Sequence, residues 1–205
     1  MAIHDQSIYL ASASPRRGEL LKQIGVHYKV LLLRTITPRA DVDETPLRDE
    51  NPEAYVDRIV RAKAEAGWIA VRGRQLPKHP LLAADTTVSI DGCILGKPAG
   101  RDHAEAMLRR LSGRTHQVFT GVAVAYEDQV ETLMSASTVE FAALSDAEIK
   151  HYVLTGEPLD KAGSYAIQGR AAAFIVRIEG SYSGVMGLPL YETTQLLKRF
   201  GVNLT

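Results

Sequence analysis

Two serines, a proline and two arginines follow one another near the amino terminus, in Ser12-Ala13-Ser14-Pro15-Arg16-Arg17. A short apolar run precedes them and a helical pattern follows, with Ser14 as the expected N-cap and Pro15 at the first helical position. Free backbone N–H groups at a helix start attract anions, and hydroxyls and guanidinium groups suit phosphate oxygens. The segment therefore predicts a phosphate-binding turn. A capped helix with solvated arginines would explain the same residues equally well.

A single acid, Asp85, lies in the apolar run from Leu81 to Val88. Burying a carboxylate is costly unless the group is paired or binds a metal. Residues 81–84 and 86–90 predict a strand that Asp85 interrupts, and a lone acid at a strand's end is often functional. The alternative is a structural acid that caps a nearby backbone. On this argument Asp85 is the best single candidate for chemistry.

Three other candidates are weaker, because solvated surface residues would explain each of them on its own. They are Glu44 in an acidic run, Lys63 on a predicted helix, and Lys97 after the hairpin turn predicted at Asp91-Gly92. That hairpin would return Lys97 toward Asp85. A later segment, 160–169, has glycines on either side of polar and aromatic residues. Such a segment indicates a loop that approaches a ligand closely.

Strands and helices that must position these residues alternate along the chain. Besides the run that contains Asp85, strands are expected at residues 8–11, 28–33, 118–126, 130–141 and 173–178. Helices are expected at 16–23, 52–67, 101–111 and 189–200, and from a Ser145–Glu148 capping box to about residue 155. Hairpins in the middle favour an α/β fold with a mixed twisted sheet flanked by helices. A chain of 205 residues can bury one good core, so a single domain, 1–205, is expected.

The composition of the chain limits the classes of ligand that it is expected to bind. The chain has 24 basic and 24 acidic residues, which favours a small charged ligand over nucleic acid or a membrane surface. No apolar run approaches the roughly 20 residues that span a bilayer. The amino terminus lacks the pattern of a signal peptide, and Cys93 is the only cysteine, so a cytoplasmic location is expected. The six histidines lack zinc-ligand spacing, so a metal would be a hard cation held by carboxylates.

As an ordered set, the motifs resemble the Maf family over nearly the whole chain. They read Ser-x-Ser-Pro-Arg-Arg, Asp-Glu, Lys-Ala, Ala-Asp-Thr, Gly-Lys-Pro, Leu-Ser-Gly-x-Thr-His and Asp-Lys-Ala-Gly-x-Tyr-x-Ile-Gln-Gly. The resemblance implies a nucleoside triphosphate pyrophosphatase on a mixed α/β fold like that of the inosine triphosphate pyrophosphatases. Residues 165–169 are similar to the branch that acts on dTTP and UTP, whereas a branch acting on 7-methyl-GTP has an acidic motif there. Residues 32–39 depart from the polar loop usual in the family.

The resemblance also implies individual roles. Phosphate contacts would come from Ser12, Arg16, Arg17, Lys63 and Lys97. Glu44 and Asp85 would hold a divalent cation, Mg²⁺ or Mn²⁺, with Asp85 also accepting a proton. Arg17, Thr86 and Gln168 match positions linked to substrate choice. The expected partner is a nucleoside triphosphate, without nucleic acid or membrane, and the family together with general base rates favours a homodimer.

Two other classes of function stay open at this point. A regulatory module that senses a triphosphate would keep the basic cluster but would not need Asp85. A nucleic-acid-binding protein that affects division is disfavoured by zero net charge and 6% aromatic residues. Release of pyrophosphate from UTP separates the enzyme from both alternatives.

Overall fold

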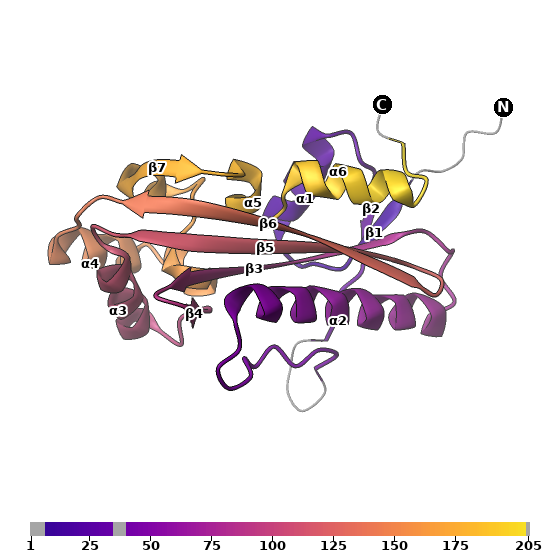
Figure 1. Ribbon diagram of the computed structural model, residues 1–205, viewed down its shortest axis with the longest axis horizontal. Helices are drawn as coiled ribbons and strands as arrows, with labels where there is room; N and C mark the ends of the chain where they lie inside the picture. Colours follow the sequence, from indigo (N-terminus) through magenta and orange to yellow (C-terminus); the bar gives the residue numbers. More distant parts are fainter. Residues whose placement is uncertain (1–6, 35–39, 204–205) are drawn as a thin grey trace.

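The computed structural model describes residues 7–34 and 40–203. A seven-stranded mixed sheet forms within these residues, in the order β2-β1-β3-β5-β6-β7 with β4 also beside β3 (Figure 1). The strands are β1 Ile8–Leu10, β2 Tyr28–Val30, β3 Leu81–Ile90, β4 Cys93–Leu95, β5 Thr115–Tyr126, β6 Gln129–Phe141 and β7 Ile175–Glu179. The helices are α1 Pro15–Gln23, α2 Pro52–Gly73, α3 Arg101–Leu111, α4 Asp146–Leu154, α5 Tyr182–Met186 and α6 Leu190–Arg199, with 3₁₀ turns at Glu157–Asp160, Ala162–Ser164 and Arg170–Phe174. The predicted α/β fold is confirmed.

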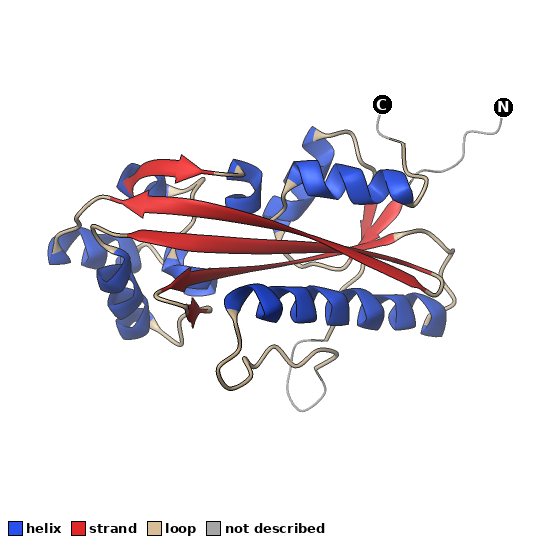
Figure 2. Ribbon diagram, in the orientation of Figure 1, coloured by secondary structure: helices blue, strands red, loops and turns tan. Residues whose placement is uncertain are grey.

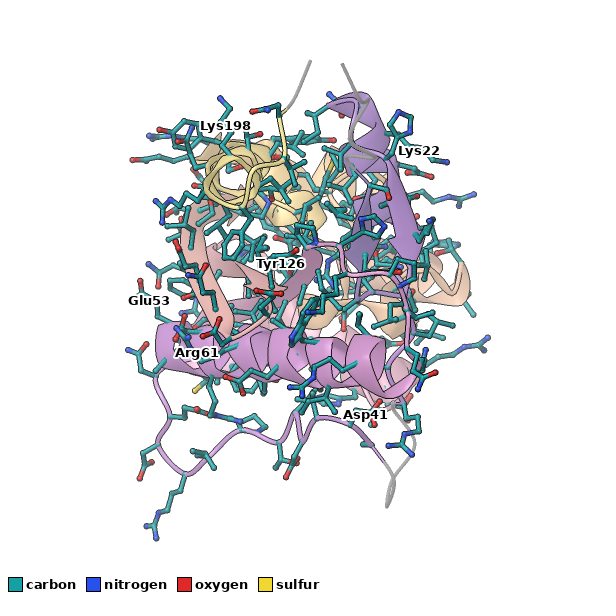
Figure 3. All side chains as sticks on the ribbon, turned by 90° about the vertical axis from the view of Figure 1, so that its right-hand side faces the viewer. Lys22, Asp41, Glu53, Arg61, Tyr126 and Lys198 are labelled. Carbon is teal, nitrogen blue, oxygen red and sulfur yellow. The ribbon has the colours of Figure 1, made fainter. Side chains whose placement is uncertain are left out.

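Helices cover both faces of the sheet, as Figure 2 shows in blue and red. Helix α2 packs Val60, Ala64 and Trp68 against one face. Helices α1 and α6 pack on the other, where Figure 3 shows Lys22 and Lys198 directed outward. Because successive residues of a strand point to opposite faces, adjacent positions of β3 serve different layers.

Asp85 lies in the middle of β3 rather than at a strand end, so that expectation was wrong. The strand continues through the acid because β5 pairs with it from Leu81 to Ser89. Gly121 of β5 is the partner of Asp85. A Cβ at Gly121 would lie 2.9 Å from Val56 and 3.0 Å from Val60 of α2. The missing side chain thus lets α2 approach the sheet beside Asp85.

The other edge of β3 is only partly paired. Strand β1 runs parallel to it at Leu81 and Leu82, and β4 pairs antiparallel with it from Val88 to Ile90. Between these two ladders, residues 83–87 have no strand partner on that edge within the described ranges. The sheet is therefore open beside Asp85 and Thr86, and side chains from both faces can reach the opening.

Several local expectations are confirmed and others corrected. Pro15 stands at the start of α1, but the Ser14 hydroxyl makes no capping hydrogen bond. The capping box at Ser145 is present. Helix α2 extends beyond the expected end to Gly73, and the short helix α5 was not predicted. The sequence pattern missed α5 because its five residues are too few to show a helical period.

His116 is buried in an aromatic cluster where β5 begins. Its Nε2 lies 2.9 Å from the Tyr165 hydroxyl, and its ring meets Phe141 edge-on at 5.0 Å. Burial lowers the pKa of His116 to about 4. The unfolded chain, in which a histidine has a pKa of about 6.5, binds more protons than the folded one between these values. His116 therefore contributes to the free energy of unfolding above about pH 6.5, and this contribution is lost as the pH falls through this window.

We expect the free energy of unfolding to fall by about 2 kcal/mol through His116 between about pH 6.5 and pH 5. His116→Gln, which keeps a polar group but does not titrate, should remove that part of the pH dependence. His151→Gln on the exposed side of α4 is the matched control and should leave it unchanged. Urea unfolding at the two pH values measures the effect. Equal pH dependence in His116→Gln and the unmodified protein would contradict the assignment.

Candidate functional site

Two acids meet one lysine on the α2 face of the open edge. Lys63 Nζ of α2 lies 2.6 Å from Asp85 Oδ1 and 2.9 Å from Glu44 Oε1. Asp85 is only 8% exposed, so the ion pair supplies the partner that a buried carboxylate needs. An ammonium has three N–H donors, and these contacts use two of them. Lys63 therefore holds the two carboxylates together and keeps one donor for a ligand.

The loop that carries Glu44 is tied to α2. The Tyr55 hydroxyl donates to the Glu44 carbonyl at 3.0 Å. Arg58 donates from Nε and Nη2 to the two oxygens of Glu50, each at 2.7 Å, and also contacts the Thr45 carbonyl. The two-pronged pair fixes geometry as well as charge. Of the unusual segment 32–39, residues 35–39 lie outside the described residues.

A second group gathers around Arg17 on the other face of the sheet. Arg17 Nε donates to the Gly187 carbonyl at 2.8 Å, Nη1 to Ser12 Oγ at 3.1 Å, and Nη2 to Thr86 Oγ1 at 3.4 Å. Thr120 Oγ1 lies 3.0 Å from Thr86 Oγ1 and 2.8 Å from the Gly184 carbonyl. These contacts hold the guanidinium in one orientation from three directions.

Every hydrogen-bond acceptor of Arg17 is a neutral oxygen. Burial is the largest influence on Arg17 and lowers its pKa; Arg16 lowers it further, whereas Asp85 and Glu44 raise it. A guanidinium nevertheless stays protonated in proteins. A half-buried cation without a bonded carboxylate is partly uncompensated, and an anion would complement it. The two acids and Arg17 thus share one electrostatic environment.

Arg16 and Lys97 lie near this environment without partners in the described part of the chain. Arg16 is half-buried, and its charge lowers the pKa values of Arg17 and Asp160. Lys97 is exposed. The predicted hairpin is present, with Val88 opposite Leu95, and this register continued two residues would bring Lys97 level with Thr86.

Gln168, like Arg16 and Lys97, makes no hydrogen bond or ion pair with the other predicted residues within the described ranges. It is exposed, in a turn where Gly169 N donates to the Ala166 carbonyl at 3.0 Å. Its segment is joined to the loop of Lys97, because Gly163 N donates to the Gly96 carbonyl at 3.1 Å. The side chain of Gln168 makes no hydrogen bond with any residue that the structure describes.

Thr120 and Gly187 were missed by the sequence analysis. Thr120 is 1% exposed, a hydroxyl in the otherwise apolar run 118–125 of β5. That is the signal that identified Asp85, and it could have identified Thr120 as well. Gly187 contributes only a backbone carbonyl, for which residue type gives no signal.

The fold and the site together define an α/β protein whose candidate site gathers acidic and basic side chains at the open edge of a strand. The chain belongs to the Maf family: the family model described as "Maf: Maf-like protein" matches residues 7–200. A dTTP/UTP pyrophosphatase of Nitrosomonas europaea is 56% identical over 198 residues, which are 96% of each chain. One of Chromobacterium violaceum is 52% identical over 204 residues, which are 100% of each chain to the nearest per cent. In the described ranges, no helix is long and apolar enough to cross a membrane.

Glu44 and Asp85 fit a divalent cation. Each has an oxygen within hydrogen-bond distance of the same Lys63 nitrogen, so two hard donors already converge on a positive group. Mg²⁺ commonly takes one or two carboxylates and completes its shell with substrate phosphates and water. The described residues hold no cluster of three or more metal-ligating side chains, so any cation here would need such additional ligands.

Proposed function

We propose that the protein hydrolyses dTTP and UTP to the nucleoside monophosphate and pyrophosphate, at the open edge of β3. The observation that carries this proposal is the half-buried Arg17, which among the described residues bonds only to neutral oxygens, beside the Glu44–Lys63–Asp85 group. The relatives named dTTP/UTP pyrophosphatase support the substrate class, since they match this chain over nearly its full length.

Binding begins with charge. A nucleoside triphosphate carries about four negative charges near neutral pH, because each phosphate loses one proton readily and the terminal one loses a second with a pKa of about 6. Arg17 offers its remaining donors in a fixed orientation, Arg16 and Lys97 add charge beside it, and Lys63 offers its third N–H. A divalent cation held by Glu44 and Asp85, Mg²⁺ or Mn²⁺, would neutralise phosphate charge and polarise the reacting group.

Asp85 is the proton acceptor in this proposal. Lys63 bonds to Oδ1, which leaves Oδ2 to accept a hydrogen bond from water. The water oxygen attacks the α-phosphorus and its proton passes to Asp85, while the bond between the α-phosphorus and the bridging oxygen breaks and pyrophosphate leaves. Side chains that are already oriented supply most of the acceleration through positioning and electrostatics.

Three narrower parts of the proposal remain predictions. Gln168 would read the base, the location would be cytoplasmic, and the protein would act as a homodimer without a nucleic-acid partner. The balance of 24 basic and 24 acidic residues supports the last point.

Incubation of the purified protein with UTP and Mg²⁺, with separation of the products, tests the function. We expect UMP and pyrophosphate in equal amounts. UDP and phosphate would mean attack at the terminal phosphorus instead. Binding of UTP without turnover would favour the regulatory module.

Replacing Arg16 by Lys keeps the charge but loses the planar fork of donors. We expect kcat/KM for UTP to fall about tenfold, the usual scale for losing one charge-assisted hydrogen bond. Arg101→Lys, on the exposed first turn of α3, is the control and should have no effect. Equal kinetics for the two variants would mean that Arg16 is an ordinary surface charge.

A further inference from the structure

The direction of the Gln168 side chain depends on the backbone of one turn. Gly169 N donates to the Ala166 carbonyl at 3.0 Å, which makes Ile167 and Gln168 the central residues of a four-residue turn. Ile167 is 3% exposed and anchors the turn in the core, while Gln168 points outward. Whatever holds the two ends of this turn therefore sets where the amide can reach.

Glu157 and Tyr152 hold both ends. The Tyr152 hydroxyl accepts from Ala166 N at 3.2 Å and donates to Glu157 Oε1 at 2.9 Å. The second oxygen, Oε2, accepts from Arg170 N at 3.2 Å. The Glu157 carboxylate is thus linked through Tyr152 to Ala166, which opens the turn, and is bonded directly to Arg170, which follows it. Bonds to a charged acceptor are stronger than those to a neutral one.

The Glu157 carboxylate packs directly against the turn. A Cβ at Gly169 would lie 2.2 Å from Glu157 Oε1, so the absence of a side chain at Gly169 leaves space for the carboxylate. Tyr152 is 3% exposed and its ring meets Phe174 edge-on at 5.2 Å. Within the described ranges no Lys or Arg side chain forms an ion pair with Glu157, since Lys161 bonds to its carbonyl oxygen and pairs with Asp160.

We propose that Glu157, together with Tyr152, is a positioning residue that fixes the Gln168 turn and thereby sets the choice of base. The inference rests on the proposed function, because it assigns a consequence to the way Gln168 is presented. Neither residue needs to touch the substrate. Their effect is on the entropy and direction of Gln168, the side chain to which the proposed function assigns the base.

Glu157→Gln should release one end of the turn. An amide has one acceptor oxygen, so its NH₂ group would face either Arg170 N–H or the Tyr152 hydroxyl. We expect kcat/KM for UTP to fall about tenfold, chiefly through KM, and the UTP-to-GTP ratio to fall with it. Turnover of ribose 5-triphosphate, which has no base, should not change. Tyr152→Phe removes both hydroxyl bonds and should act in the same direction.

A double-mutant cycle with Gln168→Ala separates this role from general support of the fold. In the Gln168→Ala background, Glu157→Gln should change the UTP-to-GTP ratio no further. Glu148→Gln, which loses a similar carboxylate bond to a backbone N–H in the α4 capping box, is the matched control and should leave the ratio unchanged. Equal losses for UTP and ribose 5-triphosphate, or a full effect without Gln168, would overturn the proposal.

Amide hydrogen exchange tests, without any turnover, whether Glu157 holds the turn. Glu157→Gln should speed exchange across residues 166–170 and leave α2 protected. Unchanged protection of the turn would overturn the positioning role of Glu157. A wild-type protein that fails to hydrolyse UTP, with the turn protected as expected, would overturn the proposed function and with it the link to base choice. The two failures are therefore distinguishable.

Discussion

Asp85→Asn is expected to lower kcat/KM for UTP about a hundredfold or more, because the variant loses both a proton acceptor and a carboxylate ligand. Asparagine keeps the shape of the side chain, and its amide oxygen can still accept from Lys63. The comparison therefore removes charge and basicity at almost constant volume. Steady-state release of pyrophosphate measures the loss.

The same variant should be slightly less stable than the unmodified protein. Removing the charge of an isolated buried acid would raise the stability, but Asp85 is paired with Lys63 at 2.6 Å. Without that charge the half-buried ammonium keeps only Glu44, so we expect a cost of about 1–2 kcal/mol. Asp91→Asn, which breaks an exposed ion pair to Arg114 in the hairpin turn, is the control and should keep full activity. Near-normal turnover by Asp85→Asn would refute its role.

The second large effect is expected at Gln168, on the choice of base. Uracil and thymine present a carbonyl acceptor at O4 beside a donor at N3, and a primary amide can pair with both. Guanine presents two adjacent donors, which a carboxylate accepts well. Gln168→Glu should therefore lose UTP and dTTP turnover while gaining relative activity toward GTP. An unpaired, desolvated donor or acceptor costs about 1–3 kcal/mol, or roughly one to two decades.

Measuring kcat/KM for UTP, dTTP and GTP in both proteins decides the question. The 5-methyl group that distinguishes thymine from uracil adds little unless a pocket crowds it, so UTP and dTTP should fall together. A loss by the same factor for all three nucleotides would mean that Gln168 supports its loop and does not read the base. Gln195→Glu on α6, remote in the chain from the turn, serves as a charge-matched control.

The sequence predicted much of this arrangement because the relevant signals are local. A carboxylate in an apolar strand identified Asp85, and Ser-Pro before two arginines identified the start of α1. The wrong placement of Asp85 at a strand end has a physical reason: the ladder to β5 that carries the strand through the acid lies far away in the chain. A hydrophobic pattern alone does not contain that pairing.

Contacts between distant segments could not be predicted in the same way. Nothing in the run around Lys63 indicates that its ammonium joins Glu44 to Asp85, since this depends on how closely α2 approaches Gly121. The open edge of β3 likewise depends on β1 ending at Leu10, where the chain turns into the loop before α1. The residue types indicated the chemistry of the site, whereas the distances between its side chains follow only from the fold.

The bond from Arg17 to the Gly187 carbonyl joins residues 170 positions apart. Contacts between residues so far apart in the chain are characteristically slow to form. A nascent chain that has not yet released residue 187 from the ribosome would hold Arg17 without this acceptor. Nucleotide binding should therefore appear late during synthesis, once α5 and α6 have docked. A bound nucleotide should then stabilise the folded protein against unfolding.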